Sequence, residues 1–567
     1  MRARRLVALL AVACGPSGSP RLAHVAAPVR SAASAVVPAP EDTPAPLPRP
    51  YDFIRVAHPG RSMALVQRKA SLDFPLGSDF VAALMTGDNA GAMIDLDAPA
   101  DFVVVDWKRA AGRVGLRPGA DVLLRDRFHA TESDGALRFT TPEHVCEARG
   151  ASLYCATDDA MLTLAVPHLR ALAREPLGSE AEVRLLFPDQ AEETPPSSDV
   201  DEQLGLEAAR TLFYGAGDAT LDVSTAGGIT LRGTVAFDDP KTPEAHWLLG
   251  SGGPAPDAMF RRLPADARVA LATSGFPAAD LVRIRALVGA SFAASVQKDG
   301  FPEAYARESA DAFLALVVTG GPLVLAGGYD ARAVERAGAA YRAHATDATY
   351  HAAQGALGGW FVAGVDEEPE RWLRGVAKIV ALDHAKVKRT PPAAKAGGAT
   401  KDDWSETVTE REATAPPGAP PRTMHLVLTT VLKHPPKDAI KTPRTAHLLV
   451  VPDGRRTWLV YAPDPALAVE KAAALVSPAA GLGSRPDAAT CTPGATTCVL
   501  FRPDALIPLS PVTKPKDVAD ALQLADRARS LAPTTMTLRV VPRGGHAEVL
   551  ATVPWQAIDE LVTLTKP

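Results

Sequence analysis

The chain has 567 residues, and its 60 Lys and Arg residues against 65 Asp and Glu residues give a formal net charge of −5. This balance argues against a dedicated nucleic-acid-binding protein, because such proteins usually carry a basic surplus or a basic stripe. The length exceeds what one hydrophobic core usually supports, so we expect two or three domains.

Residues 1–13 predict a secretion signal. Arg2, Arg4 and Arg5 precede a short apolar run that ends in small residues. Such a run is too short to span a bilayer but has the pattern of a signal peptide. No later apolar run reaches the ~18 residues that a membrane-spanning helix needs.

Cys14 follows this run directly. The sequence Leu10-Ala-Val-Ala-Cys14 resembles the lipobox of bacterial lipoprotein precursors, with Ala11 where that family more often has Leu. The resemblance covers the N-terminal stretch alone. It implies that Cys14 is acylated and becomes the first residue of the mature chain, whose formal charge is −8 once three arginines are lost. The alternative is an ordinary signal peptide in which Cys14 has no special role.

The resemblance also predicts where in the cell envelope the protein is located. The mature chain would begin Cys14-Gly15, which by similarity to enterobacterial lipoproteins favours the outer membrane, facing the periplasm or the exterior. Residues 14–50 are rich in Gly, Ser, Ala and Pro and predict an extended tether that cannot bury enough surface to fold.

Breaks in composition divide the rest of the chain. An acidic, Pro- and Ser-rich connector occupies residues 187–202, and a longer polar stretch at 389–422 predicts a disordered linker. These breaks predict three α+β domains at 51–187, 203–388 and 423–567, each of ordinary domain size.

The four remaining cysteines agree with export. Cys146 and Cys155 bracket an Ala-Arg-Gly turn, and Cys491 and Cys498 bracket Thr-Pro-Gly, so a hairpin could bring each pair within bonding range. We expect two local disulfides. A thiolate metal site is the weaker alternative, because neither pair has the spacing of a zinc knuckle.

An apolar β-prone run followed by an Asp and an Ala-rich helical stretch recurs along the chain. An Asp at the start of a helix caps free backbone N–H groups, which explains these residues without catalysis. The aspartates in this pattern are Asp158, Asp280, Asp330, Asp366 and Asp464.

Paired strands are predicted around Gly227-Gly228 and around Asp453-Gly454. A hairpin feeds into an Asp-capped helix in both the first and the third segment. We therefore expect an α+β fold of antiparallel sheets packed with helices, with duplicated ferredoxin-like units as a hypothesis.

The local motifs of common enzyme families are absent from the sequence, including the nucleophile elbow, the phosphate loop and the zinc-binding His-Glu-x-x-His. His344, Asp347 and His351 would share one face of a continuous helix and could bind a metal, or could form a solvated polar face. Asp95, Asp97 and Asp101 could attract calcium, although the intervening apolar residues favour a half-buried strand.

The sequence thus favours an envelope lipoprotein that acts as a binding or scaffold module, with no catalytic residues and no cofactor. Its expected partners are the lipid bilayer, through the acyl anchor, and an unknown envelope protein or ligand, not nucleic acid. The alternative is a tethered or secreted hydrolase with a site assembled from dispersed residues. A cleft where His, an acidic residue and Ser or a metal converge would favour the hydrolase, whereas a shallow apolar groove would favour binding. A third possibility, a pure spacer, would show neither feature.

Overall fold

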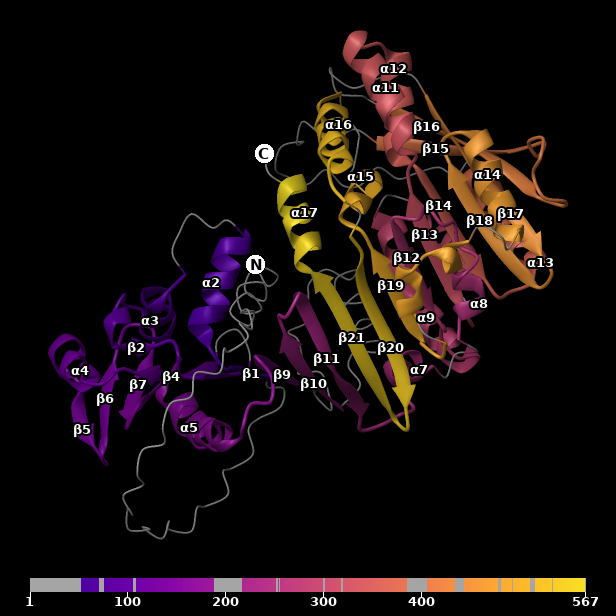
Figure 1. Ribbon diagram of the computed structural model, residues 1–567. Helices are drawn as coiled ribbons and strands as arrows, with labels where there is room; N and C mark the ends of the chain where they lie inside the picture. Colours follow the sequence, from indigo (N-terminus) through magenta and orange to yellow (C-terminus); the bar gives the residue numbers. More distant parts are fainter. Residues whose placement is uncertain are drawn as a thin grey trace. The chain divides into compact units, whose positions relative to one another are not determined.

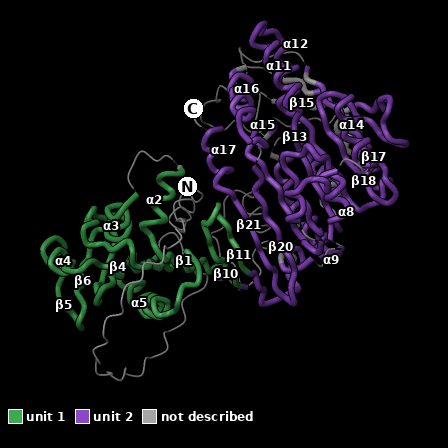
Figure 2. Tube along the Cα trace, viewed as in Figure 1, with its two compact units in different colours: residues 1–187, 218–233 green, residues 188–217, 234–567 purple. Residues whose placement is uncertain are grey.

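The structure is a computed structural model in which the chain forms two compact units, Met1–Phe187 with Asp218–Gly233, and Pro188–Gly217 with Thr234–Pro567 (Figure 2). We call them unit 1 and unit 2. In the part of the chain that the structure describes, no helix has the length and apolar character needed to cross a bilayer. The described residues are 52–70, 76–105, 109–187, 217–250, 253, 255–298, 301–317, 320–384, 405–433, 443–477, 481–491, 493–509, 515–532 and 534–565.

Unit 1 is built on an antiparallel sheet. Its strands are hydrogen-bonded in the order β5-β6-β7-β8-β4-β3-β1-β9-β10, with the short β2 also beside β4 and with β11 following β10 as a hairpin (Figure 1). The elements are β1 (Asp52–Val56), α2 (Pro59–Ala70), α3 (Ser78–Thr86), η1 (Gly91–Met93), β2 (Ile94–Asp95), β3 (Ala100–Val104), β4 (Ala110–Leu116), α4 (Ala120–Phe128), β5 (Thr131–Ser133), β6 (Ala136–Thr140), β7 (Val145–Arg149), β8 (Ser152–Ala156), α5 (Asp159–Arg174), β9 (Ala181–Phe187), β10 (Gly217–Ser224) and β11 (Gly228–Phe237).

Helices pack on both faces of this sheet. Alternate residues of a strand point to opposite faces, and on β1 Phe53 belongs to the core under α5, whose Met161, Leu162 and Leu169 are buried at helical spacing. The other face packs against α2, α3 and α4 through a second core that includes Met63, Met85 and Leu124. Two separate cores therefore hold unit 1 together.

Unit 2 is built on a larger antiparallel sheet in the order β15-β16-β17-β18-β14-β13-β12-β19-β20-β21. Its elements are α7 (Pro243–Leu249), α8 (Asp257–Phe260), β12 (Val269–Thr273), α9 (Ala278–Lys298), α10 (Glu303–Val317), β13 (Leu323–Gly328), α11 (Ala331–Ala343), α12 (Asp347–Gly358), β14 (Trp360–Val365), α13 (Pro369–His384), β15 (Ser405–Ala413), β16 (Met424–Lys433), β17 (Arg444–Asp453), β18 (Arg456–Ala462), α14 (Pro465–Val476), η3 (Leu482–Ser484), η4 (Asp487–Thr490), β19 (Thr497–Phe501), η5 (Pro503–Ala505), α15 (Leu506–Leu509), α16 (Pro515–Arg529), β20 (Met536–Arg543), β21 (His546–Pro554) and α17 (Trp555–Thr565).

Unit 2 also has helices on both faces of its sheet. Helix α14 covers a core that contains the fully buried Trp360 and Trp458, and α13 packs on the opposite face through Trp372. A third core joins α11, α12, α15, α16 and α17. The buried tryptophans act as packing anchors, because each removes a large apolar area from water.

The strands of the two units follow the same order. When β12, β13 and β14 are matched with β1, β3 and β4, and β15 to β21 with β5 to β11 in turn, the two strand orders coincide. The helices correspond as well, because a helix pair joins β1 to β3 and β12 to β13, α4 and α13 follow β4 and β14, and α5 and α14 follow β8 and β18. Helices α11, α12, α15 and α16 lie at points where unit 1 has no described helix. The chain is therefore an internal duplication at the level of topology.

The predicted α+β class with antiparallel sheets packed by helices is confirmed. The connectivity, however, is not ferredoxin-like, because three strands, β4, β3 and β1, separate the two strands that α5 joins. A ferredoxin-like split βαβ unit has one strand in that place.

The units also divide the chain differently from the predicted segments. Residues 203–388 and 423–567 were expected to form two domains, but the contacts place most of both in unit 2. The predicted linker 389–422 contains β15, which pairs with β16 along its full length. Its polar composition suits a strand at the edge of a sheet, where charged side chains suppress pairing with the strands of other molecules. The signal peptide 1–13 and the tether 14–50, including Cys14, lie outside the described residues.

Both predicted disulfides are present. Cys146 and Cys155 face each other across the β7–β8 hairpin with Cα atoms 4.1 Å apart. Cys491 and Cys498 close the loop before β19 with Cα atoms 5.7 Å apart. All four side chains are buried, so each bond lies inside a core.

Candidate binding site

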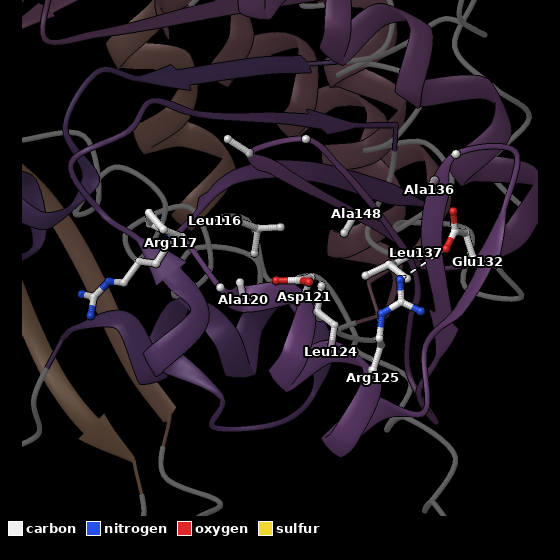
Figure 3. Close-up of a pocket in the computed structure, with 15 residues that line it drawn as sticks. Leu116, Arg117, Ala120, Asp121, Leu124, Arg125, Glu132, Ala136, Leu137 and Ala148 are labelled. Carbon is white, nitrogen blue, oxygen red and sulfur yellow. Dashed lines mark hydrogen bonds and ion pairs between the residues drawn. The ribbon is translucent and has the colours of Figure 1, made fainter.

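A hollow of about 420 Å³ opens on unit 1 where α4 begins (Figure 3). Three connections surround it: the turn from β4 into α4, the β5–β6 turn and the β7–β8 turn. Its lining residues are Leu116, Arg117, Pro118, Gly119, Ala120, Asp121, Leu124, Arg125, Glu132, Gly135, Ala136, Leu137, Ala148, Gly150 and Ala151. A cavity of this size lies within the range of small-ligand sites.

The floor of the hollow is apolar and its rim is charged. Buried Leu116, Leu124 and Leu137 form the floor. Figure 3 shows Arg117 at one end and Arg125 at the other, where its guanidinium lies 3.3 Å from a carboxylate oxygen of Glu132. With Asp121 the rim carries two positive and two negative groups. The site therefore suits an apolar ligand without net charge.

Local sequence explains why the chain turns back at this point. Gly119 has φ 81°, a left-handed conformation that glycine adopts without steric cost, and it ends the turn that leads into α4. Gly150 has φ 54° in the β7–β8 turn, and the carbonyl of the next residue, Ala151, accepts a hydrogen bond from the Leu116 amide at 2.9 Å. This bond fixes the two turns on either side of the hollow.

The ionisable groups of the hollow are carboxylates and guanidiniums. Of the described residues, no Ser, Thr, Cys, His, Tyr or Lys lines it, and its ionisable residues are Asp121, Glu132, Arg117 and Arg125. Its two carboxylates, Asp121 and Glu132, are exposed, and Glu132 is paired with Arg125.

The aspartates considered for calcium have other partners. Asp101 is 1% exposed and lies between two arginines, 3.1 Å from Arg55 and 2.6 Å from Arg113. Asp95 accepts a hydrogen bond from the amide of Asp97 at 3.0 Å. The expected half-buried strand is present at Ile94–Asp95, which form β2 with Ile94 buried and Asp95 half-buried. Asp101 lies on β3 and is held by ion pairs within the fold.

The suggested metal site at His344, Asp347 and His351 required one continuous helix. Instead α11 ends at Ala343, and α12 begins at Asp347 after Thr346, whose hydroxyl caps the new helix. The three residues therefore do not share one helical face. Among the described residues no group of three or more His, Cys, Asp and Glu side chains could hold a metal ion.

One dispersed pair has the geometry of a catalytic dyad. His246 on α7 and Asp280 on α9 lie 2.6 Å apart between Nδ1 and Oδ2, and both side chains are mostly buried. Ser274 follows β12 near the end of α7, but it is fully buried, and its hydroxyl has no hydrogen-bond partner among the described residues. Ser274 is therefore not hydrogen-bonded to this histidine.

Of the residues that line the hollow, the sequence pointed only to Ala148 and Gly150, as parts of the turn between Cys146 and Cys155, and not as a binding site. Residues of β4, α4, β6 and β7 line the hollow. They are separated in the sequence and come together only through strand pairing in the folded sheet. The only local signals are the turn glycines at 119, 135 and 150. Such glycines mark turns but do not reveal a cavity between them.

Comparisons of the chain with protein-family models, with curated proteins and with solved structures gave no match. The candidate site therefore rests on the chain's own geometry.

Proposed function

We propose that this protein is an envelope-anchored lipoprotein that acts as a non-catalytic binding or scaffold module. The lipobox-like sequence ending at Cys14 supports the anchor, and the Pro-rich stretch after it supports a tether. The folded units would then face the periplasm or the exterior, where both disulfides are stable.

The hollow on unit 1 carries the proposal of binding. It combines enough volume for a small ligand with an apolar floor and a charge-balanced rim. Apolar floors supply affinity by removing ligand surface from water, and a few rim charges orient the ligand. We place the ligand-binding site of the protein here.

Acylation tests the anchor. In the native host, the wild-type chain should incorporate labelled palmitate and fractionate with membranes, whereas Cys14→Ser should do neither. Absence of label in the wild type, together with unchanged fractionation of Cys14→Ser, would refute the anchor.

Filling the hollow with a large side chain tests whether it binds a ligand. Ala151 lines it from an exposed turn, so Ala151→Trp should fill it without disturbing a core. The neutral dye phenylnaphthylamine should bind the wild type with increased fluorescence and lose at least ten-fold in affinity in Ala151→Trp. Ala339→Trp, on the exposed side of α11 in unit 2, is the matched control and should bind as the wild type does.

The His246–Asp280 pair favours a second candidate, the tethered or secreted hydrolase. A carboxylate bonded to Nδ1 holds the imidazole so that Nε2 can act as a base. Purified protein assayed on a panel of chromogenic esters decides between the two. Turnover abolished by both His246→Ala and Asp280→Asn would establish the hydrolase, and turnover that is absent or unaffected would exclude a role for this pair.

A further inference from the structure

Two histidines on neighbouring strands of unit 2 are hydrogen-bonded to each other. His425 on β16 is 6% exposed, and His447 on β17 is half-buried. Nε2 of His425 lies 3.0 Å from Nδ1 of His447, and the two ring planes are within 26° of parallel. Nδ1 of His425 lies 2.9 Å from the carbonyl oxygen of Thr414. A chain of two hydrogen bonds therefore runs from the end of β15 through both rings to β17.

These contacts fix the positions of the protons in the neutral pair. A carbonyl oxygen only accepts hydrogen bonds, so Nδ1 of His425 carries a proton and donates it to Thr414. Nε2 of the same ring is then an acceptor, and the proton between the rings belongs to Nδ1 of His447. Nε2 of His447 is therefore the nitrogen that can take up a proton without breaking either bond.

One added proton keeps the pair intact, and a second breaks it. Protonation of His447 at Nε2 leaves its Nδ1–H as the donor to His425. A second proton would go to Nε2 of His425, and two N–H groups and two positive charges would then face each other. Burial and the neighbouring His425 already hold the pKa of His447 below its usual value, against the opposing charge of Asp464. The pair therefore resists double protonation.

The elements packed against the pair also carry charged groups. Asp464 caps the start of α14, and Glu470 and Lys471 on α14 are bonded to each other. Arg411 of β15 lies on the same face of the sheet as the pair and is exposed. Asp464 favours a proton on His447. Its single negative charge compensates for one added proton and leaves the second uncompensated.

The pair holds the connection between β15 and β16, residues 414–423. Thr414 begins this connection and is bonded to His425. In its middle, Gly418 lies so close to α14 that a methyl group on it would be 3.5 Å from the side chain of Val469. The histidine pair thus keeps the connection beside the first half of α14.

We propose that the His425–His447 pair is an acid-sensitive latch. With no added proton or one, it holds residues 414–423 against α14, and with both rings charged it releases them. Release uncovers the Val469 side of α14 and leaves the central strands of the sheet in place. The latch acts in unit 2 and does not depend on the hollow of unit 1.

Proton counting gives the direction of the pH dependence. The closed latch binds fewer protons than the open one, whose imidazoles titrate at about 6.5. Closing is therefore fully favoured above this pH and weakens as the pH falls below it. The exposed Glu370–Arg422 ion pair also holds the connection. A backbone hydrogen bond and Arg422 keep the pKa of Glu370 below its usual value, so this ion pair persists in mild acid and the histidines release first.

Hydrogen exchange of the full-length chain, measured by mass spectrometry and corrected for the intrinsic effect of pH, tests the latch. The amides of Ala419 and Thr423 are hydrogen-bonded within the connection and report its release. From pH 7 to pH 5, protection of residues 411–425 should fall at least about ten-fold, because each proton that the closed state excludes favours opening ten-fold per pH unit. Strand β13 should keep its protection and serves as the internal reference.

Two variants remove the second titration. In His447→Asn the amide can present its N–H to a neutral His425 or its carbonyl oxygen to a protonated one. In His425→Gln the amide oxygen still accepts from His447, although the bond to Thr414 is lost. Each variant should show the same protection at pH 7 and pH 5. The matched control is His344→Asn, which replaces an exposed histidine of unit 2 and should respond as the wild type does.

The outcomes decide the proposal. A loss confined to residues 411–425 in the wild type and in His344→Asn, and absent from the two latch variants, supports it. Unchanged protection of the wild type at pH 5 overturns it, as does a loss that the latch variants share. A loss that extends to β13 is acid unfolding of unit 2 and also overturns it. If His447→Asn does not fold at pH 7, His425→Gln decides alone.

Discussion

Single residues show where the fold depends on charge. Arg55 is 3% exposed on β1, and besides Asp101 it donates hydrogen bonds to the carbonyls of Leu172 and Glu175 at the end of α5. The Arg55–Asp101 pair thus connects the first strand, the third strand and the helix above them. The side-chain spacing of Asp95, Asp97 and Asp101 suggested strand alternation, but the two arginine partners come from other strands and could not be read from that motif.

Asp101→Asn should lower the free energy of unfolding of unit 1 by about 3 kcal/mol, because removing one member of a buried ion pair leaves the other charge uncompensated. Urea titration followed by circular dichroism measures the change. Asp88→Asn, which breaks the exposed Asp88–Arg127 pair, is the control and should change little. Equal effects of the two substitutions would contradict the buried role of Asp101.

Asp52 makes stability depend on pH. Burial raises the pKa of this carboxyl from 3.8 to about 6. Between these values the folded state binds more protons than the unfolded state, so this group's contribution to stability falls as pH rises through about 6. Asp52→Asn should therefore raise the urea midpoint at pH 7, with the gain shrinking toward pH 4. A gain that is the same at both pH values would show that charge burial is not the cause.

Among the elements, those with local causes could be predicted from sequence. The Gly227-Gly228 and Asp453-Gly454 hairpins are confirmed as β10–β11 and β17–β18. Asp158, Asp330 and Asp464 cap α5, α11 and α14 as expected. The other two aspartates are not at the N-cap position, because Asp366 lies three residues before α13 and Asp280 lies inside the first turn of α9. Asp366 pairs with Arg455 and Arg456, and Asp280 with His246.

The caps of α5 and α14 occupy matching places in the two units. Asp158 accepts a hydrogen bond from the Met161 amide at 2.7 Å, and Asp464 from the Ala466 amide at 2.8 Å. Asp158→Ala and Asp464→Ala should each cost about 1 kcal/mol, because each leaves a helix N-terminal amide unpaired. Asp158→Ser keeps an acceptor and should recover most of the loss in thermal unfolding. No difference between Ala and Ser would argue against capping.

At the scale of the whole molecule, domain boundaries were harder to predict than elements. Composition marked 389–422 as a linker, yet β15 lies within it and completes the sheet of unit 2. A polar strand and a disordered linker have similar composition. They differ in whether the segment pairs with a neighbouring strand, here β16, and this pairing depends on the tertiary structure. The duplication was suggested by the shared hairpin and helix, but its extent became visible only from the strand order.

Separate cores predict separate unfolding of the two units. Cys146→Ala with Cys155→Ala should lower the stability of unit 1 by about 2.5 kcal/mol, the loss expected for a short disulfide loop, and should leave the transition of unit 2 in place. Calorimetry of the full chain measures both transitions. Cys491→Ala with Cys498→Ala should shift the other one. A single transition shifted equally by both variants would show that the units unfold together.

The central claim is that the hollow of unit 1 binds a ligand of the envelope. Photo-crosslinking from benzoylphenylalanine at Val122, 57% exposed on α4 beside the hollow, tests it most directly in intact cells. The account predicts a discrete adduct at Val122 that disappears in the Ala151→Trp background, and no such adduct from the same probe at Val282 on α9 of unit 2, which is 72% exposed. An adduct at Val122 that persists when the hollow is filled, or no adduct there at all, would contradict it.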